Sequence, residues 1–185
     1  MGKALDASSD DIFVSWLPLY HDMGLIGAWL GSLYFGAHAI LMPPLAFLAD
    51  PSRWLHMISR HRATLSAAPN FAFELCHKRI SDEDIEGLDL SSLRMMVNGA
   101  EPVAPLTITR FAERFSDFKF RPEMMGPVYG LAENSVGLAF PPVGRAPIID
   151  RIQRTALSRD GIAIRADPHD VTAFEFVACG QPIPG

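Results

Sequence analysis

The chain has 185 residues, of which 49% are hydrophobic and 20% are charged, and its formal net charge is −5. This composition is typical of a folded globular domain and excludes a disordered chain. The acidic balance, without any long run of Lys or Arg, argues against a general nucleic-acid-binding protein, because neutralising phosphates requires clustered cations.

Short apolar strands alternate with helices over the first three quarters of the chain. The expected strands are 12–17, 39–42, 64–68, 93–97 and one that is closed by 127–130. The expected helices are 24–35, one opened by Pro51, 71–79 and one opened by Pro105. Proline marks many of these boundaries, since it fits the first turn of a helix and cannot donate to a strand ladder. This alternation predicts an α/β fold with a parallel sheet.

One uncharged stretch, 24–42, approaches the length of a membrane span. It contains several glycines and His38, and no Lys or Arg lies close to either end, where membrane proteins carry their topology signals. We therefore expect a buried helix, a turn and a buried strand, and no membrane span. A membrane-anchored interaction protein remains as an alternative.

The pattern changes after Phe140. Prolines and glycines interrupt a mixed-charge stretch as far as His169, and a strand is expected again at 174–177. We therefore predict an α/β unit over 1–140. Residues 141–185 are predicted to hold an irregular, insertion-like segment and the start of a further subdomain.

Cys76 and Cys179 lie far apart, and neither belongs to a CxxC pair. We therefore expect no zinc site and no disulfide framework, but two buried thiols in a reducing compartment. The polar N-terminal residues lack the apolar core of a signal peptide, so a cytoplasmic protein is expected.

Three clusters of polar and small residues each follow an expected strand, where ligands of open α/β sheets bind. The first, Leu17-Pro-Leu-Tyr-His-Asp-Met-Gly24, places His21 and Asp22 at a strand end. Taken alone, this pair fits half of a metal-dependent phosphohydrolase site if further ligands exist. It fits a histidine at a strand end equally well.

The second cluster is Val97-Asn-Gly-Ala-Glu-Pro102, whose small residues allow the backbone to approach a flat ligand. The alternative is a tight turn with Glu101 in solvent. The third is Tyr129-Gly-Leu-Ala-Glu-Asn134, where a ring and a carboxylate could stack a base and hold Mg²⁺. The alternative is a core Tyr129 and a surface Glu133. GxGxxG, GxxxxGK[ST] and GxSxG motifs do not occur.

In order and rough spacing, the clusters resemble motifs of the adenylate-forming superfamily, which contains acyl-CoA synthetases, adenylation domains and luciferases. The similarity is greatest to the fatty-acyl-AMP ligase branch. The matching segments are 16–27, 98–102, 129–133 and Cys179-Gly-Gln-Pro-Ile-Pro-Gly185. This resemblance implies that the chain is part of the large N-terminal domain of such an enzyme, truncated at both ends, with 1–140 a partial adenylate-binding core.

The resemblance also implies roles for individual residues. His21 would act where the carboxylate and acyl chain enter, and Glu133 would help to hold Mg²⁺. The nucleotide-binding set would be Asn98, Gly99, Ala100, Glu101, Tyr129, Gly130 and Ala132. Within it, Gly99, Ala100 and Glu101 would line the adenine pocket mainly through backbone, and Tyr129 would pack on the ring. Ala132 replaces the usual threonine of this motif, which removes a hydroxyl contact to phosphate.

The implied reaction is attack of a fatty-acid carboxylate on ATP to give acyl-adenylate and pyrophosphate, with ATP and Mg²⁺ as cofactors. The family's phosphate loop is expected before Met1, and its ribose-binding Asp and catalytic Lys after Gly185. The isolated chain is therefore expected to be inactive.

The acceptor depends on the branch. The stretch 148–170 lies where acyl-AMP ligases carry an insertion linked to poor use of CoA, which favours transfer to an acyl carrier protein. An acyl-CoA synthetase that forms acyl-CoA is the alternative. From another class, a non-catalytic nucleotide- or acyl-binding module also remains open.

Overall fold

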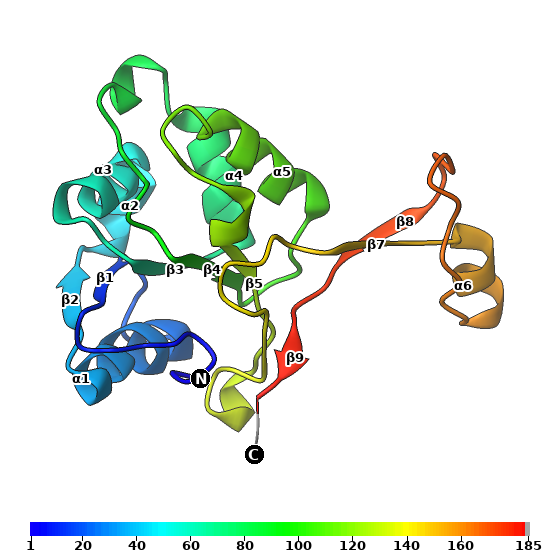
Figure 1. The fold of residues 1–185 in the computed structure, drawn as a ribbon, viewed down its shortest axis with the longest axis horizontal. Helices are drawn as coiled ribbons and strands as arrows, with labels where there is room; N and C mark the ends of the chain where they lie inside the picture. Colours follow the sequence, from blue (N-terminus) through cyan, green and yellow to red (C-terminus); the bar gives the residue numbers. More distant parts are fainter. Residues whose placement is uncertain (184–185) are drawn as a thin grey trace.

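The structure is a computed structural model that describes residues 1–183. A five-stranded parallel sheet lies at its centre, in the order β2-β1-β3-β4-β5 (Figure 1). Its strands are β1 (Ile12–Ser15), β2 (His38–Leu41), β3 (Leu65–Pro69), β4 (Met95–Gly99) and β5 (Met125–Pro127). The α/β fold with a parallel sheet, predicted from the alternation of strands and helices, is confirmed.

Helices cover both faces of the sheet. The π-helix η1 (Met23–Leu30) and the following α1 (Gly31–Phe35) lie on one face. The opposite face carries α2 (Pro44–Ala49), α3 (Ser52–His61), α4 (Asn70–Arg79) and α5 (Pro105–Arg114) (Figure 1). Right-handed crossovers explain this division, because the path from β1 to β2 runs in the opposite direction along the sheet from the path through β3, β4 and β5. Three short 3₁₀ turns complete this region: η2 (Glu83–Ile85), η3 (Pro122–Met124) and η4 (Ala132–Asn134).

Aromatic side chains fill the layer between the sheet and helices α2 to α5. The Trp16 and Phe47 rings stack with centroids 4.0 Å apart, and Trp54 meets both rings edge-on. Trp54 also links three elements, since its Nε1 donates to Ser66 Oγ (2.9 Å) and that hydroxyl donates to the Val14 carbonyl (2.6 Å). The buried indole N–H therefore has a partner, and α3 is fixed against β3 and β1.

Two expectations about the elements were incomplete. The segment expected as one helix over 24–35 is a π-helix followed by a short α-helix, which ends at Gly36 in the left-handed conformation (φ 68°). Helix α2, which begins at Pro44 shortly after the end of β2, was not expected. Proline at a first helical position explains this start, because its missing N–H would be unpaired there in any case.

The segment after Phe140 is more regular than expected. β7 (Ile149–Ile152) and β8 (Phe174–Val177) pair antiparallel, and α6 (Arg154–Asp160) lies between them in the chain. This hairpin with its helix extends away from the central sheet (Figure 1). At its base, β6 (Ala139–Phe140) pairs with β9 (Gln181–Pro182). The domain boundary at 140/141 stays a prediction, and Pro184 and Gly185, the end of the fourth motif, lie outside the described residues.

Across residues 1–183, the structure contains no helix that combines the length and apolarity needed to cross a membrane. The uncharged stretch 24–42 is divided among η1, α1 and β2.

A buried ion pair holds the N-terminal rim of the sheet. Arg94 donates from Nη2 to both carboxylate oxygens of Asp11 (2.9 Å each), and Asp11 is 3% exposed. Thr64 Oγ1 and the Ser8 amide also donate to this carboxylate. Burial alone would raise the pKa of Asp11. The hydrogen bonds and the Arg94 charge together lower it by more, so the pKa of Asp11 lies below its usual value.

We predict that Asp11→Asn lowers the local stability of β1 and β3 by about 3 kcal/mol, because it leaves Arg94 without its counter-charge. Because the pKa of Asp11 is lower in the folded state than its unfolded value of 3.8, the ionised carboxylate stabilises the protein above pH 3.8. This stabilisation is lost as the pH falls through the folded-state pKa. The deficit of the variant should therefore be full at neutral pH and shrink below about pH 4. Hydrogen exchange of the β1 and β3 amides at neutral pH and pH-dependent melting measure these effects. An equal deficit at pH 7 and pH 3 would contradict the prediction.

Candidate active site

The carboxyl ends of the central strands meet at one rim. Ala68 pairs with Asn98, and Asn98 pairs with Pro127. The Val128 amide then donates to the Asn98 carbonyl (2.8 Å), so the segment that leads to Tyr129 begins beside Gly99. The loops that follow β1, β4 and β5 thus leave the sheet at the same edge. In a sheet of this order the chain reverses direction between β1 and β3, and such a point is where open α/β sheets bind ligands.

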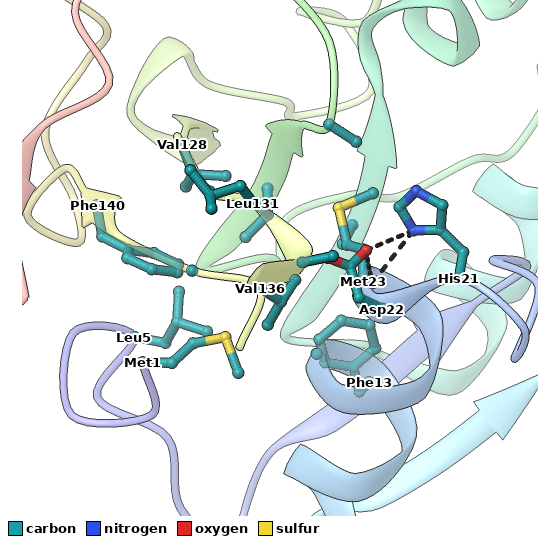
Figure 2. Close-up of a pocket in the computed structure, with 17 residues that line it drawn as sticks. Met1, Leu5, Phe13, His21, Asp22, Met23, Val128, Leu131, Val136 and Phe140 are labelled. Atoms are coloured by element: carbon teal, nitrogen blue, oxygen red, sulfur yellow. Dashed lines mark hydrogen bonds and ion pairs between the residues drawn. The ribbon is translucent and has the colours of Figure 1, made fainter. Parts of the chain in front are cut away.

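A cavity of about 230 Å³ lies at this reversal point (Figure 2). Its walls come from the sheet, from η1, from the loops after β1, β4 and β5, and from the N-terminal segment. The lining residues are Met1, Leu5, Phe13, His21, Asp22, Met23, Gly27, Ala67, Val97, Ala100, Val128, Gly130, Leu131, Ala132, Val136, Gly137 and Phe140. In Figure 2, His21 and Asp22 lie together on one side, and Met1, Leu5 and Phe140 lie on the other. The cavity therefore has a polar end and an apolar end.

His21 and Asp22 form the polar end. His21 Nδ1 lies 2.8 Å from Asp22 Oδ1, and the His21 side chain is about half exposed. Asp22 also accepts a hydrogen bond from the Met23 amide (2.7 Å), which caps the first turn of η1. The Met23 amide also lies 3.2 Å from His21 Nδ1, so Asp22 and this amide together orient the imidazole at the mouth of the cavity.

The turn after β4 is braced from the start of α4. Ala100 lines the cavity and has a positive φ of 67°, which is unfavourable for a residue with a side chain. Glu101 Oε1 accepts from the Phe71 amide (2.6 Å), and Asn70 Oδ1 accepts from the Ala104 amide (3.1 Å). These two bonds hold both ends of the turn and stabilise the strained conformation at Ala100.

Asn98 and Gly99 lie beneath this turn. Asn98 is fully buried, and its Nδ2 approaches Asn70 Oδ1 at 3.5 Å. Gly99 packs against Val128, whose Cγ2 would lie 2.7 Å from a Cβ at this position. A larger residue at position 99 would therefore push apart the two loops that follow β4 and β5.

The loop after β5 folds back on itself. Tyr129 exchanges backbone hydrogen bonds with Ala139, and the residues between them turn through η4. Gly130 is required here, because a Cβ would lie 1.6 Å from the Val136 carbonyl oxygen. Val136 itself has a φ of 81°, a rare conformation for a β-branched residue. The loop is thus held in a strained shape next to the cavity.

The predicted site residues fall into three groups by their position relative to the cavity. His21, Ala100, Gly130 and Ala132 line the cavity. Glu101, Tyr129 and Glu133 are exposed around it, and Tyr129 is 54% exposed. Asn98 and Gly99 are packed below. The clusters thus lie together, while the binding roles of the individual residues stay predictions.

The side chains beside the cavity include one possible ligand for Mg²⁺. Glu133 offers an exposed carboxylate beside the cavity. Residues 1–183 contain no group of three or more His, Cys, Asp or Glu side chains arranged to hold a metal ion. One carboxylate fits a magnesium ion whose remaining ligands are water and substrate phosphates.

Neither cysteine contributes a nucleophile. Burial raises the pKa of the Cys76 thiol, which is fully enclosed, and burial also raises the pKa of the half-buried Cys179. Both thiols therefore stay protonated at neutral pH.

Several lining residues were not predicted from sequence. Met1 and Leu5 reach the cavity from the N-terminal segment, and Val136 and Phe140 reach it from the end of the β5 loop. They are apolar residues that belong to no sequence motif, so only the folded structure shows that they line the cavity. Asp22 belongs to the first cluster, but the sequence alone does not show that its side chain caps the Met23 amide.

Comparison with known proteins gives consistent matches. The sequence profile of a family described as AMP-binding enzyme matches residues 1–169. The long-chain-fatty-acid–AMP ligase FadD26 of Mycobacterium marinum is 41% identical over 95% of this chain and 30% of its own length. The medium-chain-fatty-acid–[acyl-carrier-protein] ligase TtuA of Teredinibacter turnerae is 41% identical over 93% of this chain and 26% of its own.

A solved structure agrees. The fatty acyl-adenylate ligase from L. pneumophila, in complex with acyl adenylate and pyrophosphate, has a TM-score of 0.94 and 39% identity, covering 98% of this chain and 32% of that one. The chain thus spans about a third or less of the length of these relatives.

We predict that Glu101→Ala loosens the start of α4 by about 1 kcal/mol, because the Phe71 amide loses its acceptor and the helix loses a negative charge at its N-terminus. Glu101→Gln should retain most of this stability, since its amide oxygen still accepts. Hydrogen exchange of the α4 amides distinguishes the two variants. Equal exchange rates in the wild type and the alanine variant would show that Glu101 does not brace the turn.

Proposed function

The chain belongs to the AMP-binding enzyme family, and on that premise we propose that it forms part of a fatty-acid ligase that converts a fatty acid and ATP into acyl-adenylate and pyrophosphate. The observation that carries the proposal is the two-ended cavity at the reversal point of the sheet. Its polar end holds His21 and Asp22, and its other walls are mainly apolar. Such a cavity suits a ligand with a charged carboxylate at one end and an alkyl chain at the other.

The direction of the substrate follows from this division. The carboxylate of the fatty acid would lie near His21, which can donate a hydrogen bond to it. The alkyl chain would extend past Phe13 and Gly27 toward the apolar end of the cavity. Burial of alkyl groups against these apolar walls supplies binding free energy in proportion to the area removed from water. The Asp22 contact fixes the imidazole before the substrate arrives, which limits the entropy lost on binding.

The nucleotide would bind on the exposed side of the same rim. Tyr129 offers a half-exposed ring for stacking, and the turn at Ala100 offers backbone groups without a bulky side chain in front of them. Glu133 would hold Mg²⁺ together with the phosphates. A bound magnesium ion supplies charge neutralisation at the phosphates. The chain's own contribution is to hold the carboxylate and the nucleotide at fixed positions, which is the main source of acceleration in such transfers.

The acceptor is proposed to be an acyl carrier protein rather than CoA. The carrier-protein ligase TtuA is among the relatives, and the hairpin with α6 occupies the stretch where an insertion was expected. A cytoplasmic location is also proposed, since Cys76 and Cys179 are free thiols and the proposed reaction consumes ATP.

We predict that the protein carrying this chain in its natural reading frame catalyses ATP–pyrophosphate exchange that depends on a fatty acid. Glu133→Gln should lower this exchange about a hundredfold, with partial recovery at high Mg²⁺, because a carboxylate that neutralises developing charge is lost. Glu123→Gln is the matched control, since Glu123 is exposed on η3 before β5, at the opposite rim. No exchange with any fatty acid would refute the proposed reaction and favour a non-catalytic binding module.

We predict that the same protein transfers acyl groups from acyl-adenylate to a carrier protein at least about tenfold faster than to CoA. Single-turnover transfer from preformed acyl-adenylate measures both rates. Faster thioester formation on CoA would overturn the assignment of the acceptor and leave adenylate formation untouched.

A further inference from the structure

A second, narrow cavity of about 30 Å³ continues from the main one along η1 and α1. The two cavities share Met1, Leu5, Phe13 and Gly27 as lining residues. The new walls beyond this shared boundary are Gly2, Ala7, Gly31, Ser32, Phe35, Ala37 and Leu65. None of these side chains is charged, so the extension suits the end of an alkyl chain and not a polar group.

Packing among residues 1–183 does not explain the glycine at position 27. A Cβ built there meets a single neighbour, Met23 Cγ, at an ordinary contact distance of 3.9 Å. Other glycines of this region differ: a Cβ at Gly24 would lie 2.3 Å from the Pro18 carbonyl oxygen, and one at Gly31 would lie 3.2 Å from that of Ile26. Alanine at position 27 would therefore fit the described structure.

Helix stability also disfavours glycine at this position. Glycine loses more backbone freedom than alanine when it enters a helix, so an alanine would make η1 more stable. Gly27 lies within the eight-residue π-helix, a conformation that is rare in proteins and frequently found at functional sites. A residue that is neither required by packing nor favoured by helix formation, and that lines both cavities, keeps the space between them open.

We propose that Gly27 is a specificity-determining residue that sets the accepted chain length of the fatty acid, an inference that rests on the proposed function. The alkyl chain passes from the main cavity between Phe13 and the bare backbone at Gly27, and its methyl end enters the 30 Å³ extension. A side chain at position 27 occupies this passage and ends the binding site early. Long acids then lose contacts that shorter acids never make.

The test is the chain-length profile of acyl-adenylate formation by the protein in its natural reading frame. The variants Gly27→Ala, Gly27→Val and Gly27→Leu are compared with the wild type on saturated acids from hexanoate to palmitate. We expect kcat/KM for the longest accepted acids to fall about fourfold for each methylene that loses its burial. Values for the shortest acids should stay unchanged, so the optimum moves to shorter chains as the side chain grows.

Leu33→Phe is the matched control, because it adds apolar volume on α1 where the side chain is 63% exposed and lines neither cavity. Its profile should match that of the wild type. If a larger variant fails to fold, as judged by thermal melting, Gly27→Ala decides alone, since its Cβ has free space.

The outcomes separate the two proposals. If the wild type forms no acyl-adenylate from any acid, the proposed function is refuted, and this inference is refuted with it. The inference alone is overturned if the wild type is active and the Gly27 variants lower kcat/KM equally for all acids or leave the chain-length profile unchanged. A profile that moves toward shorter acids in the Gly27 series and not in Leu33→Phe supports it.

Discussion

The parallel register of β3, β4 and β5 is the constraint on which the rest of the structure depends. Pairing of Ala68 with Asn98, and of Asn98 with Pro127, brings the turn at Ala100 and the loop at Tyr129 to the same height above the sheet. A shift by one residue would turn each side chain to the opposite face. It would also replace Gly99 at the contact with Val128, where no Cβ fits. The close approach of these two loops is thus determined by strand pairing and one missing side chain.

The two rims of the sheet differ in how their residues are held. At the N-terminal rim, Arg94 and Thr64 fully engage a buried carboxylate, and the polar groups there have partners. At the C-terminal rim, Ala100 and Val136 adopt unfavourable backbone conformations around an open cavity. Strained residues persist only where their surroundings hold them. The bonds from Phe71 and Ala104, together with the aromatic layer beneath α4, provide that support.

Much of the fold could be predicted from the sequence, because its strands are apolar runs that proline or glycine ends. The strand expected at 174–177 has these bounds in the structure, and the family inferred from four motifs is confirmed. The failures have physical causes. α2 follows a strand without a polar linker, so its apolar residues merge with those of β2. β7 and α6 are held by arginine contacts together with a small group of buried residues such as Ile152 and Ala156, and such contacts leave no periodic pattern. The bracing of the turn by Glu101 needs two elements 30 residues apart, which only the folded chain brings together.

The hairpin with α6 shows how a segment can be added without disturbing the cavity. Arg151 donates to Glu175 and to the Asp170 carbonyl, and the Arg154 guanidinium lies 3.9 Å from the centre of the Phe174 ring. These contacts lie within the segment, while its base packs against the rest of the fold, since β8 contacts α5 and Val177 packs against the core. The chain leaves the sheet at β6 and returns in β9 beside it, and Gly180 allows this close return because a Cβ there would lie 2.0 Å from the Phe140 carbonyl carbon. A segment that begins and ends at one point can vary while the site stays fixed. Under the proposed function, this segment can therefore vary in its preference for an acceptor while His21 and the cavity keep their positions.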